Sequence, residues 1–243
     1  FSIVFPAYYF AVDSHQSNTF RGSRRSVLIS LPIIGRVIVE NLSTAIVLCA
    51  ITGILIFVIS PCSKQLIGLA AGVVGLGTAY LVFGPAYRME RIQIWLDPEH
   101  HEKGLQTMQS LYAIGSGGIF GKGLGQSMQK MGFIPESHND MIFSIVCEEL
   151  GLFGAFAVIA IFLVLIWRTL IIAMNAQDLF GSLIAIGVAV HVSIQMLINV
   201  GVVTNLFPPT GIPLPFISYG GSSLMVLLLE MGLVLSVSRQ IKI

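Results

Sequence analysis

The sequence predicts an all-α fold, a polytopic helical membrane protein with a large, partly helical extracytoplasmic loop, and three observations support this prediction. Hydrophobic residues make up 55% of the 243 residues and charged residues only 10%, with a mean hydropathy of +0.86, whereas soluble domains contain about 25% charged residues. Several apolar stretches reach the ~20 residues that a helix needs to cross a bilayer. Lysine and arginine gather on one side of these stretches, as they do in cytoplasmic loops.

Residues 1–243 are expected to form a single transmembrane domain, the C-terminal part of a longer protein, because the chain starts at Phe1 within hydrophobic sequence. Residues 27–60 are too long for one span, since a helix of that length would measure roughly 50 Å against a hydrocarbon core of ~30 Å. The polar stretch 40–43 therefore divides them. The predicted spans are residues 1–12 (the end of a span), 24–42, 44–60, 66–85, 141–167, 179–203 and 216–237.

With this division the basic residues beside the spans fall on one side of the membrane, which is expected to be the cytoplasm. The long loop 86–140 and the connection 204–215 then face outward. The net charge of +1 and the lack of a basic arm in the sequence argue against a nucleic-acid partner. The residues on the cytoplasmic side are Arg21, Arg24, Arg25, Lys64, Arg168, Arg239 and Lys242.

The outward loop contains much of the polarity of the protein. Its segment "LQTMQSLYAIGSGGIF" places apolar residues at helical spacing and predicts a helix on the membrane surface. A loop of this length is typical of a functional segment, and we expect a folded cap over the outer face. The loop and the first turns of the next span hold eight of the 12 acidic residues: Glu90, Asp97, Glu99, Glu102, Glu136, Asp140, Glu148 and Glu149.

The loop also contains the glycine-rich run "GSGGIFGKGLG" at residues 115–125. A phosphate-binding P-loop is excluded, because that motif needs glycine where Ser116 stands and serine or threonine where Gly123 stands. The glycines instead indicate sharp turns and a close approach to a neighbouring helix or a ligand. A plain turn and a ligand-lining turn both remain open, and Lys122 offers a point charge for a phosphate.

The stretch "GFIPESHNDMIFSIVCEELG", residues 132–151, gathers acidic residues at the start of an apolar span. Asp140 suits a helix N-cap. A carboxylate at the water–lipid boundary also binds a proton more readily than one in water, which suits a general base. His138 is either a surface histidine or a generic acid–base candidate. Glu148 and Glu149 lie two turns deeper and are expected to pair with arginines of the loop, because ionisable groups are costly at that depth.

Polar residues inside the later spans have two open interpretations. His191, Gln195 and Asn199 recur every four residues and so share one helix face. Hydrogen bonding between helices is the default explanation, and the lining of a substrate path is the alternative. The run "PPTGIPLPFISYGGSS" predicts a loop stiffened by prolines, followed by small residues that permit close helix contact.

Four motifs in fixed order resemble the shape, elongation, division and sporulation family of bacterial membrane proteins, which includes FtsW, RodA and SpoVE. They are "YRMERIQIWLDP", "QSLYAIGSGGIFGKGLGQS", "IPESHNDMIFSIVCEELG" and "INVGVVTNLFPPTGIPLPFISYGGSS". The resemblance is strongest to the FtsW and SpoVE branch, and it runs from about residue 40 to the C-terminus without the family's N-terminal spans. The run "VENLST" at residues 39–44 and Glu230 depart from the family pattern, so no function is expected of Glu40 or Asn41.

The resemblance implies a peptidoglycan glycosyltransferase that polymerises lipid II into glycan strands during cell division or during spore or cell wall synthesis. The family's essential aspartate falls on Asp140, the expected general base. Deprotonating a sugar hydroxyl requires a positioned carboxylate, and expelling a lipid pyrophosphate requires cationic groups. The candidate pyrophosphate or saccharide contacts are Arg88, Arg91, Lys122, Glu136, His138 and Ser218, and the candidate supporting residues are Glu148, Glu149, Pro215, Gly220 and Gly221.

The resemblance also implies a multi-pass protein of the bacterial inner or plasma membrane. Its expected partners are a class B penicillin-binding protein, which is a transpeptidase, and other divisome or elongasome membrane proteins. A divalent cation, Mg²⁺ or Mn²⁺, suits a pyrophosphate, but the sequence shows no ligand cage and no metal ligand is assigned. Two alternatives remain open: a flippase that moves lipid II, for which spans broken by Gly or Pro are typical, and a non-catalytic scaffold of the division machinery.

Overall fold

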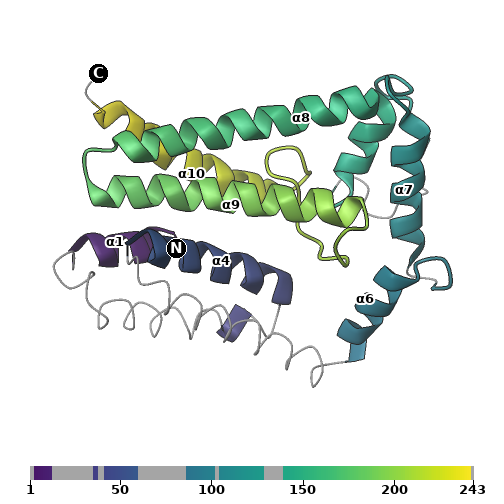
Figure 1. Cartoon of the computed structure of the whole chain (residues 1–243), viewed down its shortest axis with the longest axis horizontal. Helices are drawn as coiled ribbons and strands as arrows, with labels where there is room; N and C mark the ends of the chain where they lie inside the picture. Colours follow the sequence, from purple (N-terminus) through teal and green to yellow (C-terminus); the bar gives the residue numbers. More distant parts are fainter. Residues whose placement is uncertain are drawn as a thin grey trace. The chain divides into compact units, whose positions relative to one another are not determined.

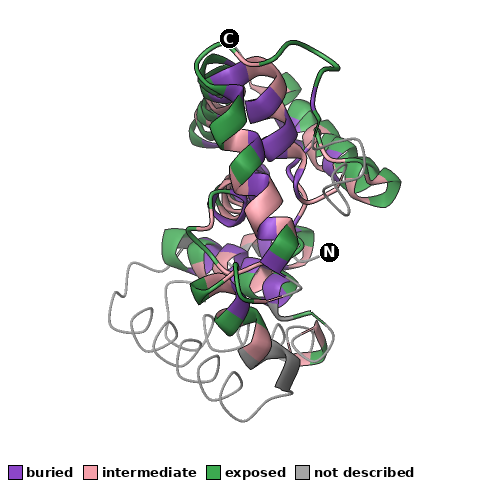
Figure 2. Cartoon of the chain, turned by 90° about the vertical axis from the view of Figure 1, so that its right-hand side faces the viewer, coloured by how far each residue is buried: buried purple, intermediate pink, exposed green. Residues whose placement is uncertain are grey.

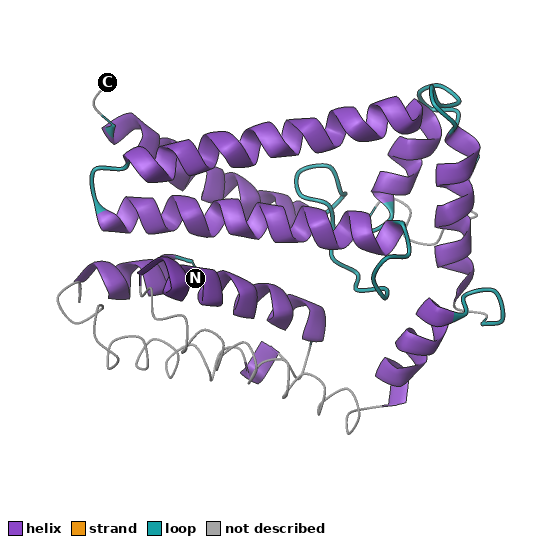
Figure 3. Cartoon of the chain, in the orientation of Figure 1, coloured by secondary structure: helices purple, strands orange, loops and turns teal. Residues whose placement is uncertain are grey.

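The computed structural model describes residues 3–12, 35–37, 41–59, 86–101, 104–128 and 139–241. These residues form helices, turns and loops without any strand (Figure 3), which confirms the all-α prediction for this part of the chain. The predicted span 66–85 and most of the predicted span 24–42 lie outside the described residues.

Three of the labelled helices in Figure 1 are long and apolar enough to cross a membrane. They are α8, α9 and α10, and α4 contains a shorter apolar run from Ser43 to Val58. This finding supports the prediction of a helical membrane protein. The helices are α1 (Val4–Val12), α4 (Leu42–Ile59), α6 (Ala86–Leu96), α7 (Leu105–Gly117), α8 (Ile142–Asn175), α9 (Leu179–Val203) and α10 (Gly221–Gln240).

Capping side chains explain where several helices begin and end. At the start of α4, Asn41 Oδ1 accepts hydrogen bonds from the backbone N–H groups of Ser43 and Thr44 at 3.1 and 3.3 Å. Asp178 Oδ2 does the same for Gly181 at the start of α9, at 3.2 Å. Asn205 follows the end of α9 with φ 57°, the left-handed conformation that commonly ends a helix. Polar residues at these points therefore fix the helix boundaries.

Two helix boundaries differ from the predicted spans. Helix α8 continues past residue 167 to Asn175. Hydropathy detects only the apolar part of a helix, and it misses last turns that extend into water. Helix α10 starts at Gly221 rather than at 216. Phe216 has φ 62°, and Ser218 Oγ accepts the Leu214 N–H at 2.7 Å, so a closed turn precedes the helix.

The chain divides into two compact units, and α8, α9 and α10 contribute residues to both. The first unit contains the described parts of residues 1–78, 166–194 and 226–243. Its helices are in close contact: Tyr8 of α1 meets Phe180 of α9 edge to face at 6.3 Å. His191 Nδ1 of α9 lies 2.8 Å from Glu230 Oε2 of α10. This contact supports the interhelical interpretation of His191.

The second unit contains the described parts of residues 79–165 and 195–225. Here α7 packs on the first turns of α8, where a methyl group added to Gly117 would lie 2.0 Å from the Cys147 carbonyl oxygen. Ser110 Oγ of α7 donates to the carbonyl of Val203 at the end of α9, at 3.0 Å. Figure 2 marks the buried, intermediate and exposed residues of these helices. Small residues thus bring the backbones of this unit together.

Helix α8 is broken at Gly151, whose φ of 69° and ψ of −168° are not helical. In a regular helix Leu152 N–H would donate to the Glu148 carbonyl and Phe153 N–H to the Glu149 carbonyl. Instead these carbonyls accept the N–H groups of Lys122 and Gly123, both at 2.9 Å. Leu152 and Phe153 donate to the Gly118 and Ile119 carbonyls, at 2.9 and 3.2 Å. The glycine-rich loop 118–123 therefore replaces the backbone bonds that the break removes.

The segment of α8 after Gly151 is about 36 Å long at a rise of ~1.5 Å per residue. That length is sufficient to cross the ~30 Å hydrocarbon core. The break thus separates a short first helix, residues 142–150, from a span-length helix.

Substitution of Gly151 by alanine should destabilise the second unit strongly. A Cβ at this position would lie 2.3 Å from the Gly121 nitrogen, in a backbone conformation with positive φ. We expect a loss of about 3 kcal/mol or more from strain and overpacking together, measured as a lower thermal unfolding midpoint in detergent.

Gly115 provides the matched control, because it is helical in α7 and a Cβ there meets no atom within 4 Å. Gly115→Ala should leave the midpoint unchanged or raise it slightly, since glycine weakens a helix. Equal stability of Gly151→Ala and the native protein would contradict the proposed exchange of backbone bonds.

Candidate active site

Asp140 lies in the turn that precedes α8, two residues before the helix begins at Ile142. Its carbonyl oxygen accepts a hydrogen bond from Asn199 Nδ2 of α9 at 2.7 Å. The same nitrogen donates to the carbonyl of Ile212 at 2.9 Å. One buried amide therefore joins the turn of Asp140 to the loop that follows α9.

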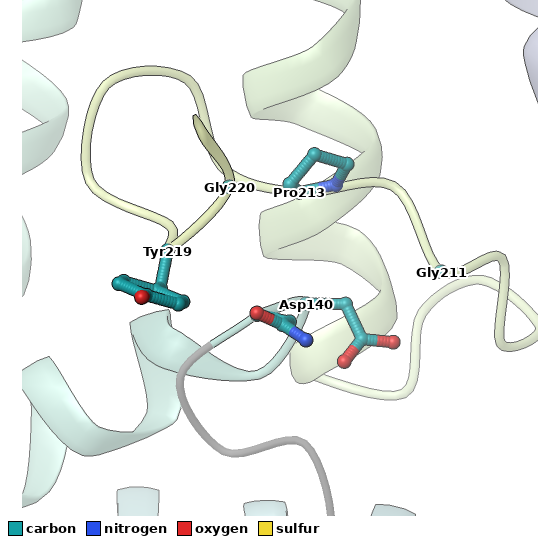
Figure 4. Close-up of a pocket in the computed structure, with 6 residues that line it drawn as sticks. Asp140, Gly211, Pro213, Tyr219 and Gly220 are labelled. Carbon is teal, nitrogen blue, oxygen red and sulfur yellow. The ribbon is translucent and has the colours of Figure 1, made fainter. Parts of the chain in front are cut away.

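A pocket with a volume of about 360 Å³ opens beside Asp140 (Figure 4). The Asp140 carboxylate points to the Gly211 side of this pocket, and a Cβ at Gly211 would lie 4.0 Å from Asp140 Oδ2. Tyr219, which is 83% exposed, lies on the other side. The volume falls within the range of small-molecule sites, roughly 300–1,000 Å³. The lining residues are Asn139, Asp140, Gly211, Pro213, Tyr219 and Gly220.

The loop 204–220 that forms one side of the pocket is fixed to α6 by two side chains. Arg91 Nη1 donates to the Pro209 carbonyl at 3.3 Å. Trp95 Nε1 donates to the Asn205 carbonyl at 3.0 Å. Arg91 is exposed to solvent. Its guanidinium has five N–H donors, and one of them makes this bond.

The remaining predicted residues of this loop are structural in their described contacts. Ser218 Oγ accepts the Leu214 N–H, and Ser218 N–H donates to the Leu214 carbonyl at 3.1 Å, which closes the turn around buried Pro215. The Gly220 carbonyl accepts the Leu224 N–H at 2.9 Å, and Gly221 is the first residue of α10. The loop thus ends at the pocket.

Lys122 and Glu148 form a separate cluster, away from the residues that line the pocket. The Glu148 side chain is fully buried, and Lys122 Nζ lies 2.7 Å from its Oε1. Ser116 Oγ donates to Oε1 at 3.3 Å, and Ser127 Oγ donates to Oε2. Arginine partners remain a prediction for Glu148, and the structure shows an ion pair with lysine. These bonds connect the glycine-rich loop to the first helix of α8.

The other predicted residues take different places. Glu149 is partly buried, and its Oε1 has no hydrogen-bond partner among the described residues. Arg88 belongs to α6, but its side chain lies outside the described part of the structure. Glu136 and His138 also lie outside the described residues. The structure therefore brings together Asp140 and Gly220 of the predicted set.

Four of the pocket residues were missed by sequence reasoning: Asn139, Gly211, Pro213 and Tyr219. Asn139 is adjacent to Asp140, and the others lie in the proline-rich run that was interpreted as a stiff loop. Their only sequence signal was that they lie within two of the quoted motifs. Asn199 was recognised as a polar helix residue, but its link to Asp140 depends on contacts across 59 residues of sequence.

The described residues include Asp140 but no cluster of metal-ligating side chains. Within the described ranges no group of three or more His, Cys, Asp or Glu side chains is placed to hold a metal ion. No chemical step is assigned to the Mg²⁺ or Mn²⁺ considered above, and Glu136 and His138 beside Asp140 lie outside the described residues.

An exposed ion pair follows α6. The Asp97 carboxylate lies 2.8 Å from His100 Nδ1, and this hydrogen bond raises the pKa of His100 and lowers the pKa of Asp97. The stabilisation from the raised histidine pKa is present at low pH and is lost as the pH rises through that pKa. Solvent screens the pair because both side chains are exposed, so it contributes little to the fold.

Comparison with known proteins identifies the family. A family model described as a cell cycle protein, FtsW/RodA/SpoVE, matches residues 2–243. The chain belongs to the FtsW/RodA/SpoVE family. The expected resemblance is confirmed over nearly the whole chain.

Two curated relatives show how much of a family member is present. Stage V sporulation protein E of Bacillus subtilis is 46% identical over 202 residues, covering 82% of this chain and 55% of that protein. The probable peptidoglycan glycosyltransferase FtsW of Trichlorobacter lovleyi is 42% identical over 206 residues, covering 84% of this chain and 54% of that protein. The chain thus spans about half the length of the curated relatives it matches.

Solved structures of the family share the fold. A chain from a study titled "Structural coordination of polymerization and crosslinking by a peptidoglycan synthase complex" matches with a TM-score of 0.72 and 30% identity, covering 89% of this chain and 61% of that chain. The rod shape-determining protein RodA of Thermus thermophilus matches with a TM-score of 0.59 and 27% identity, covering 90% of this chain and 57% of that chain.

Replacing Lys122 alone should destabilise this FtsW/RodA/SpoVE family chain more than replacing both Lys122 and Glu148. Lys122→Met removes the ammonium that lies 2.7 Å from the buried Glu148 carboxylate, a change that we expect to cost about 1–3 kcal/mol. The estimate allows for the 34% exposure of the lysine side chain. Unfolding in detergent measures the effect.

The double variant Lys122→Met/Glu148→Gln is the control, because it removes both charges and keeps an acceptor for Ser127. It should recover part of the lost stability. If the two substitutions simply added, the lysine and the glutamate would not be coupled and this account of the cluster would be wrong.

Proposed function

We propose that this chain forms the catalytic part of a peptidoglycan glycosyltransferase that polymerises lipid II, with Asp140 as the general base. The observation that carries the proposal is the Asp140 carboxylate in a pocket of about 360 Å³, two residues before the short first helix of α8. The name of the FtsW relative, a probable peptidoglycan glycosyltransferase, supports the reaction class. A carboxylate so placed suits proton abstraction from a bound hydroxyl.

In the proposed reaction Asp140 accepts the proton of a sugar 4-hydroxyl. The hydroxyl oxygen forms a bond to the anomeric carbon of the second substrate, and the bond from that carbon to the lipid pyrophosphate breaks. The pyrophosphate leaves with the bonding electron pair. Cationic groups lower the cost of this charge. The candidates that we retain are exposed Arg91 and, by its place in the α6 sequence, Arg88.

The remaining candidates receive different roles in the proposal. Lys122 supports the fold through buried Glu148 rather than binding pyrophosphate, because its ammonium is already engaged at 2.7 Å. Asn139 and the exposed ring of Tyr219 line the pocket with Asp140, so they are candidates to contact the saccharide. Glu136 and His138 stay candidates by their sequence proximity to Asp140 alone.

We further propose that the chain lies in the bacterial plasma membrane with loop 86–140 outside and the polyprenyl tail of the substrate among the spans. A class B penicillin-binding protein is the proposed partner. Support comes from the match to a chain of a peptidoglycan synthase complex. The basic residues on one side of the spans support the orientation.

Asp140→Asn should reduce lipid II polymerisation by about 10²–10⁴-fold, the range that general base catalysis contributes. The assay uses the purified full-length protein with its penicillin-binding partner and resolves glycan chains by length. Asp97→Asn, an exposed aspartate of the same unit, is the matched control and should retain full activity.

Each result of this assay decides between functions. Equal glycan synthesis by the native protein and Asp140→Asn would remove Asp140 from the chemistry. Movement of lipid II across vesicle membranes without any polymerisation would instead support a flippase. Loss of both activities from every preparation of the native protein would favour a scaffold.

The orientation has its own test. A cysteine at position 101, in a background without native cysteines, should react with a membrane-impermeant maleimide added to intact cells. Arg239→Cys, in the last turn of α10, is the control and should react only after the membrane is permeabilised. Protection of position 101 in intact cells would overturn the proposed orientation.

A further inference from the structure

Asn199 is a polar side chain almost completely buried within α9, with an exposed fraction of 1%. Its Nδ2 donates to the Asp140 carbonyl at 2.7 Å and to the Ile212 carbonyl at 2.9 Å. Two carbonyl oxygens accept hydrogen bonds and cannot donate them, so they define which end of the amide carries the hydrogens. Both donors of the side chain are therefore used to connect two other segments of chain.

Both segments contribute to the candidate pocket. Asn139 and Asp140 line it on one side, and Gly211 and Pro213, which flank Ile212, line it on the other. Figure 4 shows Asp140 across from these residues. The Asn199 amide thus holds the two sides of the pocket at a fixed separation.

The Asp140 carbonyl lies before the first residue of α8, Ile142, and accepts its hydrogen bond from Asn199. In a regular helix the N–H of Ser144 would donate to the Asp140 carbonyl. Ser144 instead donates to the Met141 carbonyl at 3.1 Å. The bond from Asn199 therefore anchors the peptide that carries the Asp140 side chain to α9.

Packing alone does not explain an asparagine at this position. Asn199 Oδ1 is buried and has no hydrogen-bond partner among the residues that the structure describes. A buried acceptor without a partner destabilises a fold by about 1–3 kcal/mol. Leucine would fill similar space without this cost, so the two donors are the feature that distinguishes asparagine here.

We propose that Asn199 is a positioning residue for Asp140, the base in the function proposed above, on which this inference rests. Its amide holds the Asp140 and Ile212 carbonyls together and so sets the distance from the carboxylate to the 211–213 side of the pocket. Without a donor between them, two carbonyl dipoles facing the same point repel each other and the turn shifts. A misplacement of about 1 Å in a catalytic group costs on the order of 100-fold in rate.

The test compares three variants of the full-length protein with its penicillin-binding partner. Asn199→Leu should lower kcat for lipid II polymerisation by about 10- to 100-fold with little change in KM. Asn199→Gln keeps both donors on a longer side chain and should recover part of that loss. Gln195→Leu is the matched control, one turn earlier in α9 with an equally unpartnered buried acceptor, and should keep native kcat.

A double variant separates positioning from general damage. In single-turnover assays with radiolabelled lipid II, Asn199→Leu should add no further loss to Asp140→Asn, because a positioning residue acts through the group it positions. A further loss of the same factor would show that Asn199 acts independently of Asp140. Native kcat in Asn199→Leu, or equal losses in Asn199→Leu, Asn199→Gln and Gln195→Leu, would also overturn the inference.

These outcomes are distinct from failure of the proposed function. Full polymerisation by Asp140→Asn would reject the base itself. An inactive Asp140→Asn beside a fully active Asn199→Leu would reject only the positioning role.

Discussion

The exchange of backbone hydrogen bonds at Gly151 is the constraint on which the second unit depends. A break in a helix leaves N–H and carbonyl groups without their helical partners, and such groups must find other partners where they are buried. The loop 118–123 supplies four such partners, at Leu152, Phe153, Glu148 and Glu149. Gly121 and Gly151 permit the approach because neither carries a Cβ. The exchange attaches α7 and its loop to the first helix of α8, which begins two residues after Asp140.

Buried polar side chains also connect the loops of the second unit to its helices. Glu148 gathers Lys122, Ser116 and Ser127 around one carboxylate within the same contact. Asn199 connects the turn of Asp140 to the loop after α9. Burial lowers the local dielectric around Glu148 and Asn199 and so strengthens the bonds that these two side chains make. The same setting makes a missing partner expensive, so both clusters specify a single arrangement of their loops.

The all-α class could be predicted from the sequence because it depends on local signals. Apolar runs of sufficient length predict helices, and Asn41 is a capping residue in the polar stretch that was expected to interrupt the spans. The glycine-rich run was correctly expected to permit a close approach to a helix. Its partner was not predictable, since the contact joins Lys122 to Glu148 and composition does not specify that pairing.

The pocket was harder to predict, because it is formed by residues whose types carry no chemical signal of their own. Asp140 was identified by its motif, whereas Gly211 and Pro213 matter through the backbone path they allow. Tyr219 was within a quoted motif, but only the fold shows that its exposed ring lies in the same pocket as the carboxylate. Long-range contacts of this kind depend on how the loop 204–220 closes, which Arg91 and Trp95 influence from α6.

The position of the polar groups bears on whether the site suits transport or group transfer. A transporter needs a polar site near the bilayer midplane, reached from either side in turn. In the second unit the pocket lies where α8 and α10 begin and where α9 has ended, so its polar groups belong to helix ends and loops. In the orientation proposed above, a carboxylate at the outer ends of these helices meets a sugar in water while the lipid part of the same substrate stays in hydrocarbon. Group transfer to a lipid-linked saccharide uses this geometry directly, because the bond that breaks lies at the junction of the polar and apolar parts of the substrate.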